Sequence, residues 1–439
     1  MIYIVLLLCI FMVFISIITE KKKLNPLTLL FMLWTIIIGL SYLRLFRLRE
    51  ASEHTYLIIM IGLTAFTIGY YFVRTFIRDR SFVLSRSRIT HKKNIYEPRY
   101  KLLYIIGGIC ILFYLYDLSI VLSYILRGSS LAHIRELAQD PNSVIYAGRS
   151  AIENSIRVLV ITPFVMALQP IVAADFWLGR RDKKLIVMDI LIILLRVITD
   201  GSRVVILYLL LHLLVAAQFT GEKSGRQKIK LTKKNLKKAG VIGVIIAIGG
   251  YALYKTTLSR SGDSFVRYMY YYFSMQPYMF EIWSNIVDNA GITGYGLAST
   301  NGFMFAFLYI IKNFLGLQNY PEYWYSIYSL IGATDSHWQV IAGDATIANA
   351  YVSIFWFFYL DGRIFGIIIG MAIYGMICAR TFMKANKQRT ARSICIYSII
   401  LQGICFSFVR LQFADIYYAI AVIFILIFAY KKTRSTNCQ

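Results

Sequence analysis

Between residues 255 and 361 the chain reads TTLSRSGDSFVRYMYYYFSMQPYMFEIW (256–283), then two glycine-punctuated turns, then SLIGATDSHWQVIAGDATIANAYVSIFWFFYLDGR (329–363). This is the one long segment that separates hydrophobic runs. It is too polar for a bundle of membrane-spanning helices. It is also too aromatic for a disordered linker. We therefore interpret Lys255–Asp361 as an extracytoplasmic cap loop with short interfacial helices, and as the place to look for an active site.

The rest of the chain has the composition of a multi-pass membrane protein. Apolar residues make up 58% of it and charged residues only 16%, against about 25% charged in a typical soluble domain. The mean hydropathy is +0.61. Apolar runs of about 17–25 residues recur along the length, each long enough to cross the hydrocarbon core. These features predict an all-α polytopic membrane protein.

The apolar runs predict eleven membrane spans as the minimum and fourteen as the upper limit. The eleven are Ile2–Ile18, Pro26–Leu43, Tyr56–Val73, Leu102–Leu126, Val158–Leu178, Leu185–Ile198, Val204–Phe219, Ala239–Tyr254, Ile364–Ala379, Ile394–Val409 and Phe413–Tyr430. Placing the basic connectors inside puts the N-terminus outside and the C-terminus in the cytoplasm. The predicted parts are N-terminal membrane helices (1–254), the cap (255–361), and C-terminal helices with a cytoplasmic tail (362–439).

Three segments test this topology. The N-terminus lacks a basic region before its apolar run, so we predict a first helix and not a cleavable signal peptide. The connector Arg44–His54 is basic although the alternation places it outside. The aromatic run Ile347–Leu360 could form a twelfth span. We favour an interfacial or re-entrant helix there, because a span would put residues 255–344 on the wrong side.

The net charge of +25 fits the positive-inside bias of cytoplasmic loops better than nucleic-acid binding, because the basic runs lie between spans. Lysine and arginine separate under the predicted topology. Only Lys255 and Lys312 of the lysines fall outside, whereas twelve arginines do: Arg44, Arg47, Arg49, Arg127, Arg135, Arg149, Arg157, Arg203, Arg260, Arg267, Arg363 and Arg410. Arginine binds phosphate or carboxylate in two places. The alternative is headgroup contact and local salt bridges.

Two polar clusters are candidates for a site. Asp200-Gly201-Ser202-Arg203 forms a turn between two apolar runs, where charge is costly and often functional; the alternative is an internal Asp200–Arg203 pair. Arg260 and Arg267 flank SGDSFV and precede a tyrosine-rich run that contains Tyr271 and Tyr272. Arginines beside aromatic rings suit a glycan attached to a phosphate. The alternative is an interfacial aromatic belt.

His337 is the notable histidine, because it lies in the cap as Asp335-Ser336-His337-Trp338. An imidazole there could act as a general base or orient a phosphate oxygen, although a lone loop histidine is often structural. Asp344, Asn349 and Asp361 are weaker candidates in the same loop. No HExxH, paired-histidine, CxxC or nucleotide-binding motif occurs, so we expect no metal and no cofactor.

The chain resembles the Wzy-type oligosaccharide repeat-unit polymerases, which are related to O-antigen ligases. The resemblance rests on GSR (201–203) opening a span, a long loop after the eighth span, and NAYVSIFWFFYLDGRIFGIIIGMAIYG (349–375). The matching positions are Asn349, Tyr359, Asp361, Gly366, Gly370 and Gly375. Where this chain has Asp361-Gly362-Arg363, such polymerases commonly read DFG. The resemblance covers Thr199 to the C-terminus, and the N-terminal spans by hydropathy only.

The resemblance implies metal-independent glycosyl transfer at the outer face of a bacterial inner membrane, acting on undecaprenyl-pyrophosphate-linked oligosaccharides. A chain-length regulator and a flippase of the same pathway would be partners. By analogy with the ligases, Arg203, Arg267 and His337 are the expected catalytic residues. The expected pyrophosphate- and glycan-binding residues are Arg260, Arg149, Arg410, Arg363, Asp200, Tyr271, Tyr272, Asp335 and Asn349.

Three alternatives stay open. An O-antigen-type ligase shares the donor and uses another acceptor. A lipid-linked-sugar glycosyltransferase is disfavoured, since the first external loop, Arg44–His54, lacks paired acids. A non-enzymatic flippase or transporter should have short, even loops and often an internal repeat. This chain has no evident repeat and concentrates its polar residues in one external loop.

Overall fold

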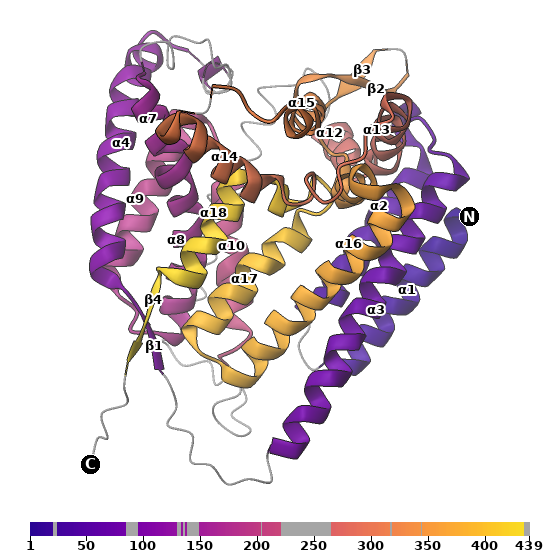
Figure 1. Ribbon diagram of the computed structural model, residues 1–439, viewed down its shortest axis with the longest axis horizontal. Helices are drawn as coiled ribbons and strands as arrows, with labels where there is room; N and C mark the ends of the chain where they lie inside the picture. The colour runs from indigo at the N-terminus through magenta and orange to yellow at the C-terminus, as the bar shows by residue number, and fades with distance from the viewer. Residues whose placement is uncertain are drawn as a thin grey trace. The chain divides into compact units, whose positions relative to one another are not determined.

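The computed structural model describes residues 1–20, 24–84, 95–129, 133–134, 137, 149–202, 204–220, 265–316, 318–343 and 345–433. The chain forms two compact units that interleave along the sequence (Figure 1). Unit 1 comprises Met1–His91, Val266–Lys387 and Ile400–Ala419, and unit 2 comprises Lys92–Phe265, Gln388–Ile399 and Ile420–Gln439.

Six helical segments within the described ranges are long and apolar enough to cross a membrane. They are α1 (Ile2–Thr19), α2 (Pro26–Leu43), α3 (Glu53–Leu84), α4 (Tyr100–Leu126), the run of α7 (Ala151–Ile156), η2 (Arg157–Ile161) and α8 (Thr162–Leu178), and α16 (Ser353–Gln388). The chain is therefore a multi-pass helical membrane protein, as its composition predicts.

Four further predicted spans coincide with helices that are shorter or, in the case of α9, richer in charged residues, so the total of eleven stays a prediction. These helices are α9 (Lys183–Asp200), α10 (Val204–Ala217), α17 (Ala391–Cys405) and α18 (Ile416–Ile427). The predicted span Ala239–Tyr254 lies outside the described residues.

Close glycine contacts join α3 to α16 in unit 1. A Cβ atom on Gly69 would lie 2.0 Å from the Ala372 carbonyl oxygen, and one on Gly375 would lie 2.2 Å from the Phe66 carbonyl oxygen. Small residues allow helix backbones to approach this closely in membranes, where packing replaces the hydrophobic driving force. Gly375, a position of the sequence motif, thus has a packing role.

Helix α16 is broken at Gly362 and Arg363, whose backbone angles are not helical. A Cβ on Gly366 would lie 2.1 Å from the Phe358 carbonyl oxygen, although eight residues of straight helix would separate the two by about 12 Å. The segment from Ser353 to Asp361 therefore folds back on the segment that follows. It is too short to span a membrane, in agreement with the short non-spanning helix expected here; the helix begins at Ser353, after a strand.

The described part of the cap before α16 consists of α12 (Phe265–Tyr272), α13 (Gln276–Ala290), α14 (Asn301–Leu315), α15 (Glu322–Ser336) and a hairpin of β2 (Gln339–Ala342) and β3 (Thr346–Ala348). Figure 1 shows α12, α13, α15 and the hairpin gathered at one end of α1, α2 and α3. The first connector joins them, because Leu48 pairs with Ala342 and Arg49 N donates to Ile341 O at 2.9 Å. The basic connector Arg44–His54 thus lies beside the cap, as the predicted topology requires.

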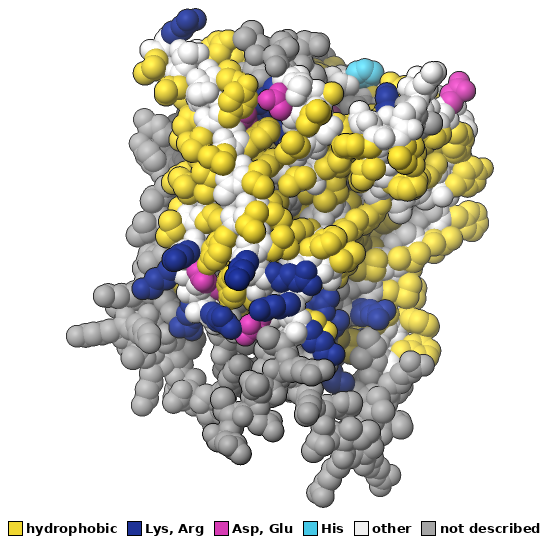
Figure 2. All heavy atoms as spheres, turned by 60° about the vertical axis from the view of Figure 1, so that its left-hand side comes forward, with side chains coloured by type: hydrophobic (Ala, Val, Ile, Leu, Met, Phe, Trp, Pro, Cys, Tyr) yellow, Lys and Arg dark blue, Asp and Glu magenta, His cyan; other side chains and the backbone are white. Residues whose placement is uncertain are grey.

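Basic connectors gather at one end of unit 2. There β1 (Ile95–Pro98) pairs with β4 (Tyr430–Thr433), Arg180 bonds Glu97 at 3.0 Å, and Arg392 lies 4.5 Å from the Tyr96 ring. Figure 2 shows Lys and Arg side chains collected at one end of a hydrophobic band. All these connectors were predicted to be cytoplasmic, and their shared end fits the positive-inside bias.

We expect cysteine labelling to distinguish the two faces. Ser329→Cys on exposed α15 should react with a membrane-impermeant maleimide in intact cells, because α15 belongs to the cap. Lys431→Cys, on exposed β4, should react only after permeabilisation. The background is the chain with Cys405 and Cys438 replaced by serine, which is also the control, since Cys9, Cys110, Cys378 and Cys395 are buried. Labelling of Lys431→Cys in intact cells would contradict the topology.

Candidate functional site

The structure brings the predicted site residues together in two groups, one in each unit. The cap group in unit 1 contains Arg267, Asp335, His337, Asn349 and Arg410, around the β2–β3 hairpin. The arginine network in unit 2 contains Arg149 and Asp200. Arg203 and Arg260 lie outside the described residues, as does Asp344.

The cap group is centred on Asp335, in the last turn of α15. Its carboxylate forms an ion pair with Arg410, and its carbonyl accepts from the Asn349 side chain. The Ala350 N–H also donates to Thr334 O at 2.7 Å, which holds the connector between β3 and α16 against α15. Asp335, Asn349 and Arg410 thus lie in contact with one another's segments. Each was a predicted site residue, but the sequence did not indicate these contacts.

His337 follows α15 directly, and its backbone N–H donates to Ala333 O at 2.8 Å. Its side chain is exposed and has no hydrogen-bond partner among the described residues. The neighbouring Trp338 is 58% exposed. His337 is therefore held through its backbone, and its imidazole is accessible to a ligand.

Arg267 on α12 contacts the hairpin. Its Nη2 donates to Thr346 Oγ1 at 3.1 Å, and its guanidinium carbon lies 5.7 Å from the centre of the Tyr271 ring. Tyr271 is buried and donates to Phe46 O at 2.8 Å. Arg267 is thus held over a tyrosine that also ties α12 to the first connector.

Two further tyrosines of α12 also pack within the protein. The Tyr270 hydroxyl donates to Leu40 O and accepts from Leu45 N, both at 2.8 Å, and burial raises the pKa of this phenol. The Tyr272 ring is half-buried and lies 5.2 Å from the ring of Tyr351. Both tyrosines therefore have packing partners within the protein, apart from any role in binding a sugar.

The connector between β3 and α16 carries backbone strain. Ala350, Tyr351 and Ser353 have φ angles of 55°, 50° and 68°, in a region that costs non-glycine residues about 1–3 kcal/mol each. Bonds from Ser353 N to Val409 O (3.2 Å) and from Ile354 N to Ser407 O (2.7 Å) hold the segment. Strain of this kind clusters at functional sites, and here it adjoins Asn349 and Arg410.

Arg363 and Asp361 have structural partners instead. Arg363 Nε lies 2.6 Å from Asp288, and its terminal nitrogens donate to Ile292 O and Val287 O, both at 3.0 Å. The Asp361 carboxylate accepts from Ala298 N at 2.8 Å and from Ser299 N at 2.9 Å. Both residues therefore lock the break in α16 to the α13–α14 connection.

The arginine network of unit 2 links three arginines through two aspartates. Arg149 lies 2.5 Å from Asp117 and Arg157 lies 3.6 Å from it. Asp200 lies 3.0 Å from Arg157 and 3.4 Å from Arg196. The side chains of Arg149 and Asp117 are 1% and 2% exposed. These five side chains thus form one connected ion-pair network in unit 2.

The fold places this network away from the basic connectors. Asp117 is on α4, Asp200 and Arg196 are on α9, and Arg157 begins the π-helical turn η2; such turns are frequent at functional sites. Figure 1 shows α7, which precedes η2, and the β1–β4 pair at opposite ends of α4. The network thus lies at the end of α4 opposite the β1–β4 pair, the end that the predicted topology places outside.

Sequence reasoning did not select Asp117, Arg157 or Arg196 for the site. Asp117 carried a usable signal, because it is the only charged residue in the predicted span Leu102–Leu126, and an ionisable residue within a span is a site candidate by default. The partners of Asp200 were not predictable from its neighbours. The expected alternative, a pair with Arg203, concerns a residue outside the described ranges.

Within the described ranges, no group of three or more His, Cys, Asp and Glu side chains is arranged to hold a metal ion. The chain was also compared with known proteins. No family model, no curated protein and no solved structure matches it.

Proposed function

We propose that the chain is a glycosyltransferase that polymerises undecaprenyl-pyrophosphate-linked oligosaccharide repeat units, without a metal, at the outer face of a bacterial inner membrane. The observation that carries the proposal is the buried network in which Arg149, Arg157 and Arg196 meet Asp117 and Asp200. A cluster of fixed guanidinium groups suits a pyrophosphate, since arginine binds phosphate oxygens in a two-point geometry. The resemblance in residues 349–375 supports the same class.

The proposed reaction joins two lipid-linked substrates. A hydroxyl of the acceptor repeat unit attacks the anomeric carbon of the donor glycan, and the bond from that carbon to the pyrophosphate oxygen breaks. The bonding electron pair leaves with the pyrophosphate, whose added negative charge is stabilised by positive groups fixed before the reaction. The hydroxyl proton passes to a base, and the accessible imidazole of His337 is the candidate in the cap.

The cap residues have distinct proposed roles. Arg267, held by Thr346 and Tyr271, is positioned to bind a phosphate or a glycan carboxylate. Arg410, Asp335 and Asn349 position the segment that carries His337. An O-antigen-type ligase would use the same donor chemistry, so the acceptor distinguishes the two enzymes. A ligase variant loses attachment while polymer is still made.

We expect His337→Ala to reduce elongation at least about a hundredfold, because general acid–base groups typically contribute about 10²–10⁴ in rate. The matched control is His54→Ala, another exposed histidine in unit 1. Arg267→Gln should have a similar effect, with exposed Arg127→Gln as its control. The measurements are surface glycan length in the native host and elongation of a lipid-linked repeat unit by purified protein. Long chains in both variants would contradict the site.

A further inference from the structure

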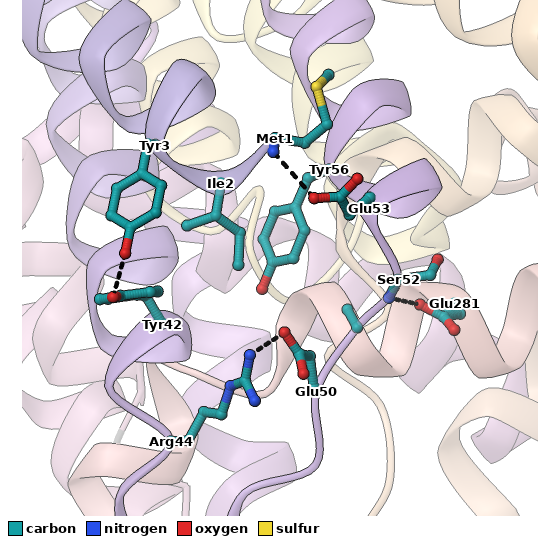
Figure 3. A pocket seen from close by; sticks show the side chains of 11 residues that line it. Met1, Ile2, Tyr3, Tyr42, Arg44, Glu50, Ser52, Glu53, Tyr56 and Glu281 are labelled. Atoms are coloured by element: carbon teal, nitrogen blue, oxygen red, sulfur yellow. Dashed lines mark hydrogen bonds and ion pairs between the residues drawn. The ribbon is translucent and has the colours of Figure 1, made fainter.

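A cavity of about 690 Å³ lies in unit 1, beside the first turns of α1 and α3, the end of α2 and helix α13 (Figure 3). Such a volume is within the range of about 300–1,000 Å³ typical of ligand pockets. Its polar lining consists mainly of three glutamates and three tyrosines: Glu50, Glu53, Glu281, Tyr3, Tyr42 and Tyr56. None of these residues belongs to the cap group or to the arginine network.

Each glutamate uses one carboxylate oxygen within the protein. Glu50 Oε1 pairs with Arg44, and Glu53 Oε1 lies 3.2 Å from the Met1 amino group. Glu281 Oε2 accepts from Ser52 N at 2.5 Å and from Thr55 Oγ1 at 2.8 Å. The second oxygen of each carboxylate has no partner among the described residues. These contacts orient three acceptors and leave an oxygen of each for a ligand.

The lining excludes several classes of ligand. The carboxylates do not converge, because no set of three acidic side chains within the described ranges could hold a metal ion. Arg44 is outnumbered by the glutamates, so a phosphate would be repelled. A lipid tail would have to bury charged groups without partners, which is costly. What fits is an extended molecule rich in hydroxyl donors.

The tyrosines fit the same ligand. The Tyr3 and Tyr42 rings meet edge to face at 5.2 Å, their hydroxyls bond each other, and they are 61% and 39% exposed. Tyr56 forms the floor, with its hydroxyl 2.9 Å from Ser41 Oγ. Open aromatic rings beside carboxylates offer both an apolar face for sugar C–H groups and acceptors for sugar hydroxyls.

We propose that this cavity binds the carbohydrate part of the lipid-linked oligosaccharide, as neutral or amino sugars; this rests on the proposed function. A shared connector joins the cavity to the cap group. Arg44 and Glu50 line the cavity, and between them Arg49 donates to Gly343 O at 3.3 Å and to Ile341 O through its backbone N at 2.9 Å. A glycan in the cavity therefore lies next to the connector that supports the hairpin.

The test measures binding of a soluble probe to the purified full chain. The probe is the host's repeat-unit oligosaccharide, released from its lipid by mild acid, and binding is followed by saturation-transfer NMR and calorimetry. Glu50→Gln and Glu53→Gln should each raise the Kd about tenfold, as expected for loss of a hydrogen bond to a charged acceptor. Glu322→Gln, an exposed glutamate on α15 outside the cavity, should leave it unchanged within about twofold.

Two further measurements make the result decisive. Tyr42→Phe removes only a hydroxyl and should weaken binding even if a glutamate variant proves unstable. Calorimetric titrations with calcium chloride and with spermidine should give the same heat for the unsubstituted chain and for Glu50→Gln. Cation binding that is lost in Glu50→Gln, without any sugar binding, would overturn the proposal. If sugar binding requires Glu50 and Glu53 but the unsubstituted protein elongates no lipid-linked repeat unit, glycan binding in the cavity is supported and the proposed polymerase function is refuted. Normal elongation and unchanged sugar binding in the glutamate variants would refute glycan binding in the cavity and leave the proposed polymerase function standing.

Discussion

Asp117→Ala should lower the free energy of unfolding by about 3–5 kcal/mol, the cost of removing one partner from a buried ion pair. Asp117 is 2% exposed and lies between Arg149 and Arg157. Its loss would remove this carboxylate from the guanidinium groups of both Arg149 and Arg157 in a buried site. The measurement is thermal unfolding of the purified protein in detergent, together with the yield of folded protein.

The matched control for this prediction is Glu322→Ala, an exposed acid on α15, which should change stability by less than about 0.5 kcal/mol. A double-mutant cycle of Asp117→Asn and Arg149→Met isolates the pair. We expect a coupling energy of about 1–3 kcal/mol, since contacting residues in one network are not additive. Additive effects would show that the two side chains do not form the buried pair.

Gly375→Ala should also be strongly destabilising, by about 1–3 kcal/mol or more, because over-packing forces neighbouring backbone to move. The added methyl would lie 2.2 Å from the Phe66 carbonyl oxygen, and that of Gly69→Ala would lie 2.0 Å from the Ala372 carbonyl oxygen. Both contacts are with backbone and not with flexible side chains. The combined variant should therefore separate α3 from α16.

Gly39→Ala and Gly108→Ala are the controls, because a Cβ at either position meets nothing within 4 Å. Replacing an unconstrained helical glycine by alanine is neutral or stabilising, by up to about 1 kcal/mol. Thermal unfolding of the four single variants measures the difference. Equal stability of Gly375→Ala and Gly39→Ala would refute the close crossing of α3 and α16.

The helices were predictable because a membrane span is a local property of the chain. Pro26–Leu43 was predicted with the bounds that α2 has, and Leu102–Leu126 lies within two residues of α4. An apolar run of sufficient length must satisfy its backbone within itself, so it becomes a helix without help from elsewhere. An interfacial or re-entrant helix was predicted over Ile347–Leu360; the observed helix begins at Ser353, after the strand β3.

The candidate site was less predictable, because its contacts join residues that are distant in the sequence. The cap residues Asp335, Asn349 and Arg410 were each selected as polar residues on the outer side, and only the fold shows that they meet. Arg363 was selected by the same reasoning, and the fold instead gives it Asp288 and two backbone carbonyls. The residue type and the predicted side of the membrane do not distinguish an arginine of the cap group from one whose partners are structural.

From the sequence alone one can infer the multi-pass helical architecture, because hydropathy acts over short stretches of chain; the outward cap and the segregation of arginine from lysine stay predictions from the same local patterns. The partners of each arginine depend on tertiary structure. Asp117, Arg157 and Asp200 belong to three different helical segments, and an ion pair forms only where packing brings such segments within a few ångströms and excludes water. The ion-paired arginine network is therefore a property of the folded chain.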